Sequence, residues 1–528
     1  MTIKSIEKSW ELVVIGGGVT GAAIFREAVR MGIKVILLEK KDFAWGTSSR
    51  SSKMVHGGLR YLKEGKFFLT RDSVKERQRL LAEAPGLIEP LGFLMPVFSD
   101  FGPSKTIMNI GLSIYSLMAL EKQHISYNVK NIKKLIPYLK STHLTGGFYF
   151  KDAQVDDARL VLRLINEGVL HGGLALNYTC AKDIHRNRRG NIAAITAEDI
   201  ETKENVELRT KAVINATGVW AEKLHPSPEK GIHIRALRGS HLIFPQEILP
   251  IDNVISFIHP KDKRPVFVFP WEKTSMLGTT DLDHDYDINI EPAITQEETS
   301  YLMEGLHYIM PGLKISQNDC ISSIAGVRPV LSKKKGVLAS NESREHVVWE
   351  NNGLITVTGG KFTTFRLMAR DALKKVCQYL PEFKLLSNNK PVFDTVFKVS
   401  KNIKILNENI QESLFGRYGN AANTLADSCD KKYLTHIRGT STLWAELVHT
   451  SKNEQVRHLS DLLLRHTRIG LLLPIGAIEH FNEIKEICKK SLRWDDNRWE
   501  IEKKQYLKEW EYAYAPPNKK NCRRKVDG

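Results

Sequence analysis

The first forty residues alternate between apolar and polar stretches in an order typical of a strand, a helix and a second strand. Glu11 to Ile15 is a short apolar run, and Val19 to Met31 has apolar residues along one side of a helix. Val35 to Leu38 is apolar again and leads to an acid, Glu39. This order predicts a βαβ unit.

Later apolar runs predict further strands at Ala212–Asn215, Val266–Phe269 and Leu354–Val357. The nucleotide-binding domain is therefore expected to be assembled from separate segments of the chain. Residues 230–320 are strand-rich and are expected to form a second layer over it. From about Asn402 onward, helical spacing with strong charge predicts a helical C-terminal domain, with a boundary near the segment KPVFDTVFKVS.

The length of 528 residues allows a large core and favours two or more domains. The six cysteines lie far apart without a C-x-x-C pair, which fits neither a disulfide framework nor a zinc site. The N-terminal residues lack the regions of a signal peptide, and the longest uncharged apolar stretch, Ile107–Leu120, is shorter than the roughly 20 residues of a spanning helix. We therefore expect a reducing compartment, no transmembrane segment and no metal site.

The formal net charge of +17 indicates attraction to an anion. Phosphate groups of a substrate, anionic lipid and nucleic acid would each meet this description, and the charge does not choose among them. The final run NKKNCRRKVDG is either a solvated tail or a surface-binding element.

A glycine motif links the first predicted strand to its helix. Gly16 permits the tight turn, Gly18 lets the backbone approach a pyrophosphate, and Gly21 lets helix and strand pack closely. The helix N-terminus supplies amide donors, and Glu39 would accept hydrogen bonds from a ribose. Because strand, helix and acid all stand at the right spacing, the motif predicts an adenine dinucleotide rather than a structural glycine turn.

A second stretch, V-I-N-A-T-G at residues 213–218, leads from an apolar strand into Ala-Thr-Gly. This pattern recurs in two-dinucleotide-binding flavoproteins, where it passes close to the cofactor, and it favours FAD over NAD. Taken alone, Ala-Thr-Gly is also a common exit from a strand.

The loop SSKMVHGGLRYL begins a dozen residues after Glu39. Its serines, with Lys53, suit a flavin pyrophosphate, and Gly57 and Gly58 would let the backbone pass near a flat ring. His56 could then stand beside the flavin and Arg60 could reach a substrate anion. The alternative is that His56 is a packing residue and Arg60 forms a surface ion pair.

Seven segments occur in the order of the FAD-dependent glycerol-3-phosphate dehydrogenases and closely resemble them. They are GTSSRSSKMVHGGLRYL, FKDAQVDDARLVL, VINATGVWAE, LRGSHLIFP, MLGTTD, AGVRPV and GGKFTTFR. The resemblance runs from about residue 10 to 375, and VRHLSDLLLRHTRIGLL resembles the helical cap of that family.

The resemblance implies an α/β fold with a Rossmann-like, two-dinucleotide-binding FAD domain, a β-rich substrate domain and a helical C-terminal cap domain. An FAD-dependent oxidoreductase region is expected over residues 1–390, a helical domain over 400–515 and a basic tail over 516–528. FAD-binding segments are expected at about 10–90, 150–230 and 320–375, and substrate-domain segments at about 91–149 and 231–319.

The activity implied by the resemblance is oxidation of sn-glycerol 3-phosphate to dihydroxyacetone phosphate, with FAD as hydride acceptor and a membrane quinone as electron sink. The substrate-binding positions expected from the family are Arg60, Tyr61, His241, Thr279, Thr280, Arg328 and Lys361. The positions expected to contact FAD are Gly16, Gly18, Gly21, Glu39, Thr47, Ser48, Ser52, Lys53, Gly57, Gly58, Ala181, Thr217, Gly218, Gly326, Gly360, Lys361 and Thr363.

The chemistry of alcohol oxidation agrees with this inventory. A phosphate dianion is bound well by a planar bidentate donor together with point charges, which arginines and a lysine supply. Removal of the hydroxyl proton needs a base, and a cation steadies the developing alkoxide. We assign His56 as the base, with His241 as the competing candidate, and Arg328 as the alkoxide stabiliser.

Basic charge and the apolar Ile107–Leu120 segment, between Lys105 and Lys122, suit docking at an anionic interface, but the same segment would also suit a buried helix. We expect a cytoplasmic homodimer bound peripherally to the inner face of the cytoplasmic membrane. A glycerol-3-phosphate oxidase that uses oxygen is the alternative enzyme. An FAD-containing RNA-binding protein is a distant alternative, because the basic residues are scattered, and no nucleic-acid partner is expected.

Overall fold

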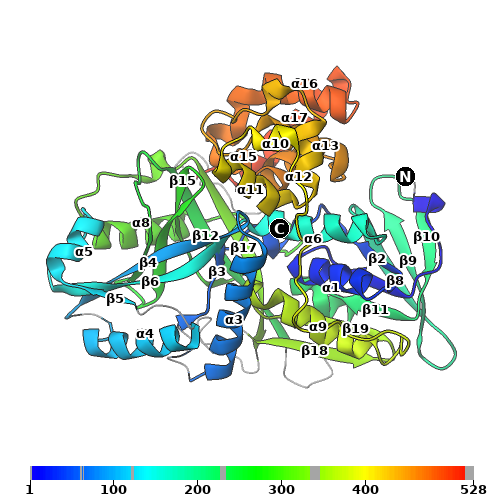
Figure 1. The fold of residues 1–528 in the computed structure, drawn as a ribbon, viewed down its shortest axis with the longest axis horizontal. Coiled ribbons are helices and arrows are strands. Elements are labelled where there is room, and N and C mark those ends of the chain that lie inside the picture. The colour runs from blue at the N-terminus through cyan, green and yellow to red at the C-terminus, as the bar shows by residue number, and fades with distance from the viewer. Residues whose placement is uncertain are drawn as a thin grey trace.

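The computed structural model describes residues 3–59, 62, 65–100, 102–119, 124–225, 233–332 and 345–517. Two sheet-centred halves lie side by side, and a helical domain sits above them (Figure 1). The fold is mixed α/β with a C-terminal helical domain, as the resemblance implied. Within these ranges no helix is both long and apolar enough to cross a bilayer.

The first half is built on a sheet that we call the cofactor sheet. Its strand order is β18 (His346–Asn351), β19 (Leu354–Gly359), β11 (Ala212–Asn215), β1 (Leu12–Ile15), β2 (Val35–Leu38) and β7 (Leu174–Leu176). All neighbours are parallel except β18 and β19. The predicted βαβ unit and the predicted strands at 212–215 and 354–357 are confirmed here.

Both faces of the cofactor sheet are covered, which is why its strands are apolar at every position. Leu12 and Val14 face the helices α1 (Val19–Arg30), α6 (Asp157–Leu170) and α9 (Phe365–Val376). Val13 faces a small sheet on the other side. The small sheet has the order β10 (Asn205–Arg209), β9 (Ile192–Asp199), β8 (Thr179–Arg186).

The second half is built on a large, mostly antiparallel sheet. Its main order is β16 (Leu282–Asp283), β12 (His233–Pro245), β15 (Thr274–Gly278), β14 (Pro265–Trp271), β13 (Val254–Ile258), β4 (Ile88–Phe98), β6 (Leu144–Val155) and β3 (Met54–Val55). β17 (Ser322–Ser332) pairs with β12, and β5 (Ile125–Tyr127) pairs with β6. The helices of this half are α3 (Phe67–Glu83), α4 (Lys105–Ala119), α5 (Val129–Leu135) and α8 (Gln296–Ile309).

Two predicted segments belong to a different sheet than expected. Val266–Phe269 lies in β14 of the large sheet and not in the nucleotide-binding sheet. The predicted FAD-binding segment 320–375 begins with β17, which pairs with β12 along its whole length. An apolar run has the same appearance in either sheet, so the sequence pattern could not assign these strands.

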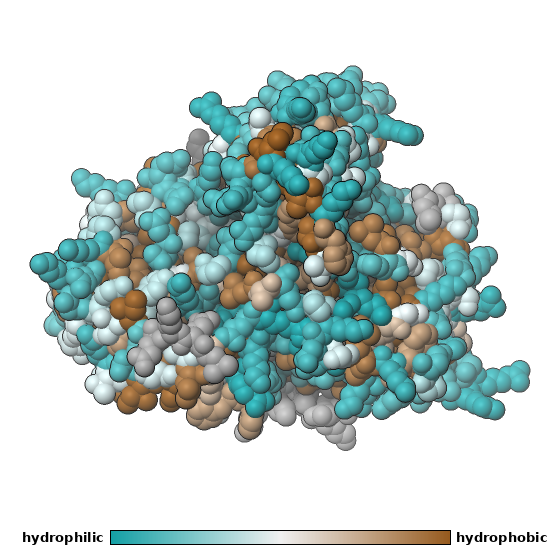
Figure 2. Space-filling view, in the orientation of Figure 1, coloured by the Kyte–Doolittle hydropathy of each residue, from teal (hydrophilic) through white to brown (hydrophobic). Residues whose placement is uncertain are grey.

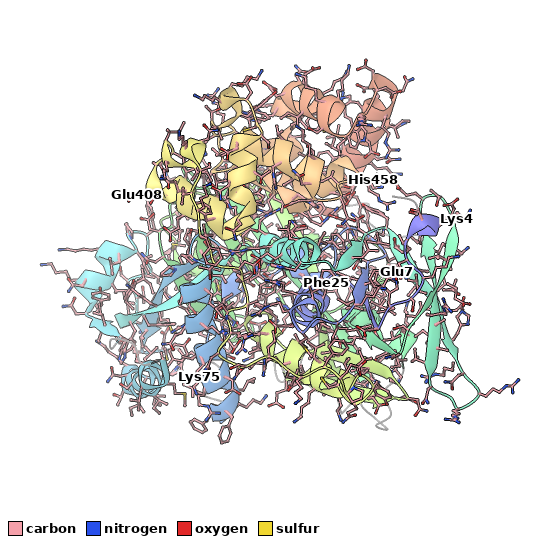
Figure 3. All side chains as sticks on the ribbon, turned by 45° about the vertical axis from the view of Figure 1, so that its right-hand side comes forward. Lys4, Glu7, Phe25, Lys75, Glu408 and His458 are labelled. Atoms are coloured by element: carbon pink, nitrogen blue, oxygen red, sulfur yellow. The ribbon has the colours of Figure 1, made fainter. Side chains whose placement is uncertain are left out.

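The helical domain begins near the predicted position. Its longer helices are α11 (Glu408–Tyr418), α13 (Trp444–Asn453), α16 (Phe481–Ser491) and α17 (Asp496–Ala513), with shorter ones at α10 (Lys401–Lys404), α12 (Ala421–Asp427), α14 (Leu459–Asp461) and α15 (Ile469–Leu472). In Figure 3, His458 marks the underside of this domain, where its Nε2 lies 3.2 Å from Glu201 Oε1 of the small-sheet side.

A buried network of charges joins the helical domain to the cofactor sheet. Arg465 Nε donates to Asp42 Oδ2 at 2.6 Å, and Asp42 lies only three residues beyond Glu39. The next residue, His466, lies 2.9 Å from Glu454 through its Nδ1. These side chains are fully or almost fully buried, so the charges compensate one another in a medium of low polarity.

Replacing His466 by glutamine is expected to destabilise this junction by about 3 kcal/mol. Burial alone would lower the pKa of His466, but the charges of Asp42 and Glu454 outweigh it and raise the pKa to about 9. A group with a raised pKa contributes its full share to the free energy of unfolding below its unfolded pKa of about 6.5. This contribution is lost as the pH rises through about 9. The difference in melting temperature between wild type and variant should therefore be larger at about pH 6 than at about pH 9.5. An equal difference in melting temperature at both pH values would contradict the charged role of His466.

Candidate active site

A cavity of about 1310 Å³ lies between the two sheet-centred halves. Its wall on one side is formed by residues at the carboxyl ends of β1, β2, β11 and β19, namely Ile15, Leu38, Ala216 and Gly359. Its other side is formed by the large sheet, including Phe150 and Arg328. Ligands of open α/β sheets bind outside the carboxyl ends of the strands, so the cavity stands where a dinucleotide is expected.

The glycine motif forms the turn at the end of β1. Gly16 has a φ of +107°, and a Cβ on it would lie 2.6 Å from the carbonyl oxygen of Ala216. A Cβ on Gly21 would lie 1.8 Å from the carbonyl oxygen of Gly16. Gly16 and Gly18 line the cavity, whereas Gly21 lies beneath it and permits the close packing of helix on strand.

The cradle at the start of α1 leaves room for a pyrophosphate and a ribose. The N-cap residue Gly18 provides no capping side chain, and Val19 N donates to Ser48 Oγ at 2.9 Å. Glu39 lines the cavity and accepts from Gly17 N at 2.7 Å and from Lys41 N at 2.8 Å. Each carboxylate oxygen can accept more than one hydrogen bond, so Glu39 can still receive a ribose hydroxyl.

These residues fit FAD. The helix N-terminus offers amide donors to a pyrophosphate, and the cavity continues from this cradle past Thr217 and Gly218 to the large sheet. The other predicted cofactor positions that line it are Thr47, Ser48, Ser52, Gly58, Ala181, Gly360, Lys361 and Thr363.

Lys53, which the sequence predicted to bind the pyrophosphate, has its ammonium engaged within the protein. Its side chain is 1% exposed and does not line the cavity. The ammonium donates to Asp157 Oδ1 at 2.6 Å and to the carbonyl oxygen of Ser49 at 2.7 Å. Lys53 therefore fixes the loop on α6 and does not contact a ligand.

Gly57 and Gly326 are also displaced from their predicted roles, because neither lines the cavity. A Cβ on Gly57 would lie 2.3 Å from the hydroxyl of Tyr115, so the glycine makes room for that side chain and not for a flavin. A Cβ on Gly326 would lie 2.7 Å from the carbonyl oxygen of Arg50, so this glycine lets β17 approach the cofactor loop.

Arg328 projects from β17 into the wall of the cavity. Its Nη1 lies 3.1 Å from Asp281 Oδ1, and its Nη2 donates to Thr279 Oγ1 at 2.9 Å. A Cβ on Gly239, in the neighbouring strand β12, would lie 2.2 Å from Arg328 Nη2. The glycine of the LRGSH segment therefore leaves space for the guanidinium. Arg264 approaches the same carboxylate at 3.1 Å and also lines the cavity.

Lys361 reaches the cavity from the turn after β19. Its Nζ donates to Ser73 Oγ of α3 at 3.0 Å. Arg60 and Tyr61, the other predicted substrate residues of this region, lie outside the described residues, as does the basic tail from residue 518 onward.

His56 lines the cavity together with Arg328 and Lys361. Its burial, together with the charges of Lys361 and Arg77, lowers its pKa to about 4. The ring is therefore neutral near pH 7 and able to accept a proton.

The structure does not place His241 and Thr280 at the cavity wall. His241 is fully buried, and its Nε2 is 2.9 Å from Ser52 Oγ, which separates the ring from the cavity. The Thr280 hydroxyl donates to Glu298 Oε1 at 2.6 Å, whereas Thr279 lines the cavity, so Thr279 is the better placed of the two candidate threonines. His241 can reach a substrate only through Ser52.

The sequence interpretation missed two acids that organise the site. Asp281, the acid of MLGTTD, orients Arg328, and Asp152, the acid of FKDAQVDD, lines the cavity beside the His56 loop. Asp152 lies within β6 and Asp281 directly precedes β16, and both side chains are buried, so each carboxylate requires a cationic partner. Neither the burial nor the partners Arg77 and Arg328 could be deduced from the sequence.

Comparisons with known proteins agree with this geometry. The family model "FAD dependent oxidoreductase" matches residues 11–372, and the model "C-terminal domain of alpha-glycerophosphate oxidase" matches residues 384–499. The aerobic glycerol-3-phosphate dehydrogenase of Staphylococcus haemolyticus is 30% identical over 509 residues, which covers 91% of this chain and 91% of the relative. The Staphylococcus aureus protein of the same name is 30% identical over 484 residues, covering 87% and 86%.

Solved structures give the same result. The glycerol-3-phosphate dehydrogenase of Bacillus halodurans, complexed with FAD, superposes with a TM-score of 0.73 at 25% identity and covers 95% of both chains. The L-alpha-glycerophosphate oxidase of Mycoplasma pneumoniae, with FAD bound, has a TM-score of 0.57 at 18% identity, covers 74% of this chain and 100% of its own, and shares the fold.

Proposed function

Because the chain belongs to the family of FAD-dependent glycerol-3-phosphate dehydrogenases, we propose that it oxidises sn-glycerol 3-phosphate to dihydroxyacetone phosphate and passes the electrons to a membrane quinone. The C2 hydroxyl loses its proton, and the hydrogen on C2 leaves with two electrons as a hydride. FAD is the cofactor, and when bound it supplies the acceptor of that hydride. The observation that carries the proposal is that His56, Arg328 and Lys361 line the same cavity as the dinucleotide cradle.

Each of these side chains has a distinct part in the proposed reaction. His56 takes the proton of the C2 hydroxyl, because it lines the cavity and its imidazole is in the neutral, proton-accepting form near pH 7. Arg328, oriented by Asp281, donates to the oxygen on which negative charge develops. Lys361 supplies a point charge for the phosphate, and Arg60 and Tyr61 would complete the phosphate and hydroxyl contacts.

Anaerobic addition of sn-glycerol 3-phosphate to the purified holoenzyme tests the reaction. Prompt bleaching of the oxidised flavin band is expected, because the substrate reduces the cofactor directly. Absence of bleaching in protein that demonstrably holds FAD would overturn the assignment of the substrate.

The apolar end of the cavity favours a quinone as the electron acceptor. Phe93, Met95, Phe257 and Phe267 of the large sheet line it, and Met108 of α4 lines it as well. An apolar part of the cavity wall suits contact with an apolar acceptor. Reoxidation of the reduced enzyme by a quinone analogue should therefore be faster than reoxidation by air. Faster reoxidation by air, with formation of peroxide, would instead establish the alternative activity of an oxidase.

Helix α4 offers a surface for docking on a membrane. Its outward residues Ile107, Ile110, Ile114 and Leu117 are 63%, 56%, 38% and 75% exposed, whereas Leu112 is buried. Figure 2 shows apolar residues gathered along the lower left edge, where α4 lies in Figure 1. Exposed lysines of the nearby α5, Lys130 and Lys134, would face anionic lipid. We therefore propose peripheral attachment to the inner face of the cytoplasmic membrane.

The double variant Ile110→Ser, Leu117→Ser is expected to weaken binding to phospholipid vesicles about 100-fold or more. Each substitution removes about 1.5–3 kcal/mol of apolar burial in the interface. Cosedimentation with vesicles measures the loss, and turnover with a soluble dye should be retained. Ile405→Ser is the matched control, because Ile405 is equally exposed at 68% but lies in the helical domain. Unchanged cosedimentation of the double variant would rule out α4 as the docking surface.

A further inference from the structure

The inward face of α4 carries polar groups that reach the active-site loop. Tyr115 is 2% exposed and lies on the side of α4 opposite to the exposed Ile114 and Leu117. In Figure 3, α4 is seen end-on beside α3, which is marked by Lys75. One helix thus presents apolar residues to the outside and a tyrosine hydroxyl to the interior.

The hydroxyl of Tyr115 joins three separate parts of the chain. It donates to Asp152 Oδ2 of β6 at 2.7 Å and accepts from the backbone N–H of Gly57 at 3.0 Å. The same hydroxyl lies 3.4 Å from Arg77 Nη1 of α3, and Arg77 donates to Asp152 Oδ1 at 3.0 Å. The Tyr115 hydroxyl and both carboxylate oxygens of Asp152 are each hydrogen-bonded within this buried cluster, so the position of the hydroxyl is defined.

The cluster fixes the backbone next to His56. Gly57 N donates to Tyr115 and, at 3.3 Å, to Asp152, while the carbonyl oxygen of His56 accepts from Thr363 Oγ1 at 3.3 Å. The peptide group between His56 and Gly57 is therefore held from both sides. The missing side chain of Gly57 is what allows the tyrosine to approach, since a Cβ would lie 2.3 Å from the Tyr115 hydroxyl.

The neighbouring helix α3 holds a second residue of the site in the same way. Ser73 accepts the ammonium of Lys361 at 3.0 Å, one turn before Arg77 reaches Asp152. At its start α3 carries Phe67 and Phe68, which are 50% and 75% exposed. Both helices with exposed apolar residues therefore also support residues of the cavity wall.

We propose that Tyr115 is a positioning residue for the oxidation, and that its hydroxyl holds the His56 backbone in place. The position of α4 against the protein therefore affects the rate of flavin reduction. The inference deepens the proposed function and rests on it, because it assumes that His56 removes the substrate proton. Tyr115 does not line the cavity and acts only through Gly57 and Asp152.

Stopped-flow reduction of the FAD-containing enzyme by sn-glycerol 3-phosphate tests the inference. Tyr115→Phe keeps the ring and removes the hydroxyl, so the limiting rate should fall about 10- to 100-fold, as expected for a misplaced catalytic group. The half-saturating substrate concentration should change less than about threefold, because the phosphate contacts are untouched. The solvent isotope effect on the limiting rate, which reports transfer of the hydroxyl proton to His56, should rise, and loss of stability alone would not cause this change.

Tyr418→Phe is the matched control. Its hydroxyl is also buried and donates to a carboxylate, Glu446 Oε2 at 2.9 Å, but it lies in the helical domain. This control should lose comparable thermal stability and keep the wild-type limiting rate. If Tyr115→Phe binds FAD weakly, the limiting rate is measured with FAD added in excess, and the loss of rate should persist at saturating FAD.

A wild-type limiting rate in Tyr115→Phe, or an equal loss in Tyr418→Phe, would overturn the positioning role. Failure of the substrate to bleach the wild-type flavin would instead overturn the proposed function itself. The two failures are distinguishable because only the second affects the unmodified enzyme.

Discussion

An enzyme in which Arg328 is replaced by methionine is expected to lose about 10³- to 10⁴-fold in kcat/KM for sn-glycerol 3-phosphate. The guanidinium is held by Asp281 and Thr279 at 3.1 and 2.9 Å, so it is oriented before the substrate arrives. Its donors then meet charge that develops on the substrate oxygen without further rearrangement. Arg328→Lys keeps the charge but loses the planar fork, so we expect an intermediate loss of about 10- to 100-fold.

Arg235→Met is the control for this prediction. Arg235 forms the same kind of pair with an aspartate of the same sheet, Asp283, at 2.5 Å, but neither residue lines the cavity. Its replacement should change kcat/KM less than about threefold. If Arg328→Met retains activity while Arg264→Met loses it, the alkoxide is stabilised by Arg264, which shares the carboxylate of Asp281.

The sequence predicted the parts of the site that depend on short spacing. The strand, glycine turn, helix and Glu39 follow one another within thirty residues, and the cradle has the predicted geometry. Backbone conformation and helix N-termini are local properties, so their chemistry can be deduced from neighbouring residues. His56 was expected near the flavin from the residues of its loop, and Arg328 near the substrate from the resemblance to a family; both line one cavity in the structure.

The sequence could not predict the environment of side chains whose partners are distant in the sequence. Lys53 has the appearance of a phosphate ligand until Asp157, 104 residues later, is seen to neutralise it. The charge pair of Asp42 and Arg465 joins residues 423 positions apart. No local pattern contains such partners, and a buried lysine and an exposed one have the same letter in the sequence.

Gly57 has a neighbour in the structure that the sequence motif did not indicate. The glycine was predicted to pass near a flavin ring, but its free space is filled by Tyr115 of α4. A glycine in the pattern HGG can therefore be required by the contact between its loop and α4 as well as by proximity to the cofactor. Gly239 likewise makes room for Arg328 from the neighbouring strand.

Replacing His56 by glutamine is expected to slow flavin reduction about 10²- to 10⁴-fold, the range that a general base contributes. Because the pKa of His56 is lowered to about 4, its base form is present above that pH and is lost as the pH falls through it. The wild-type rate of flavin reduction should therefore not change with His56 ionisation between about pH 6 and 8, and should fall below about pH 5. In His56→Gln this acidic decline should disappear. Rapid-mixing measurements across this range, on enzyme with its FAD content verified, provide the check.

His241 is the base against which this prediction has to be tested. Its ring is buried and reaches the cavity only through Ser52 Oγ, 2.9 Å from its Nε2. If His56 is the base, His241→Gln and Ser52→Ala should each retain flavin reduction within about tenfold of wild type, because neither removes the proton acceptor. If both variants instead lose about 10²-fold or more while His56→Gln remains active, the proton passes through Ser52 to His241. The cluster of Tyr115, Asp152 and Gly57 would then position only the cavity wall, so the same three variants also decide what that cluster is for.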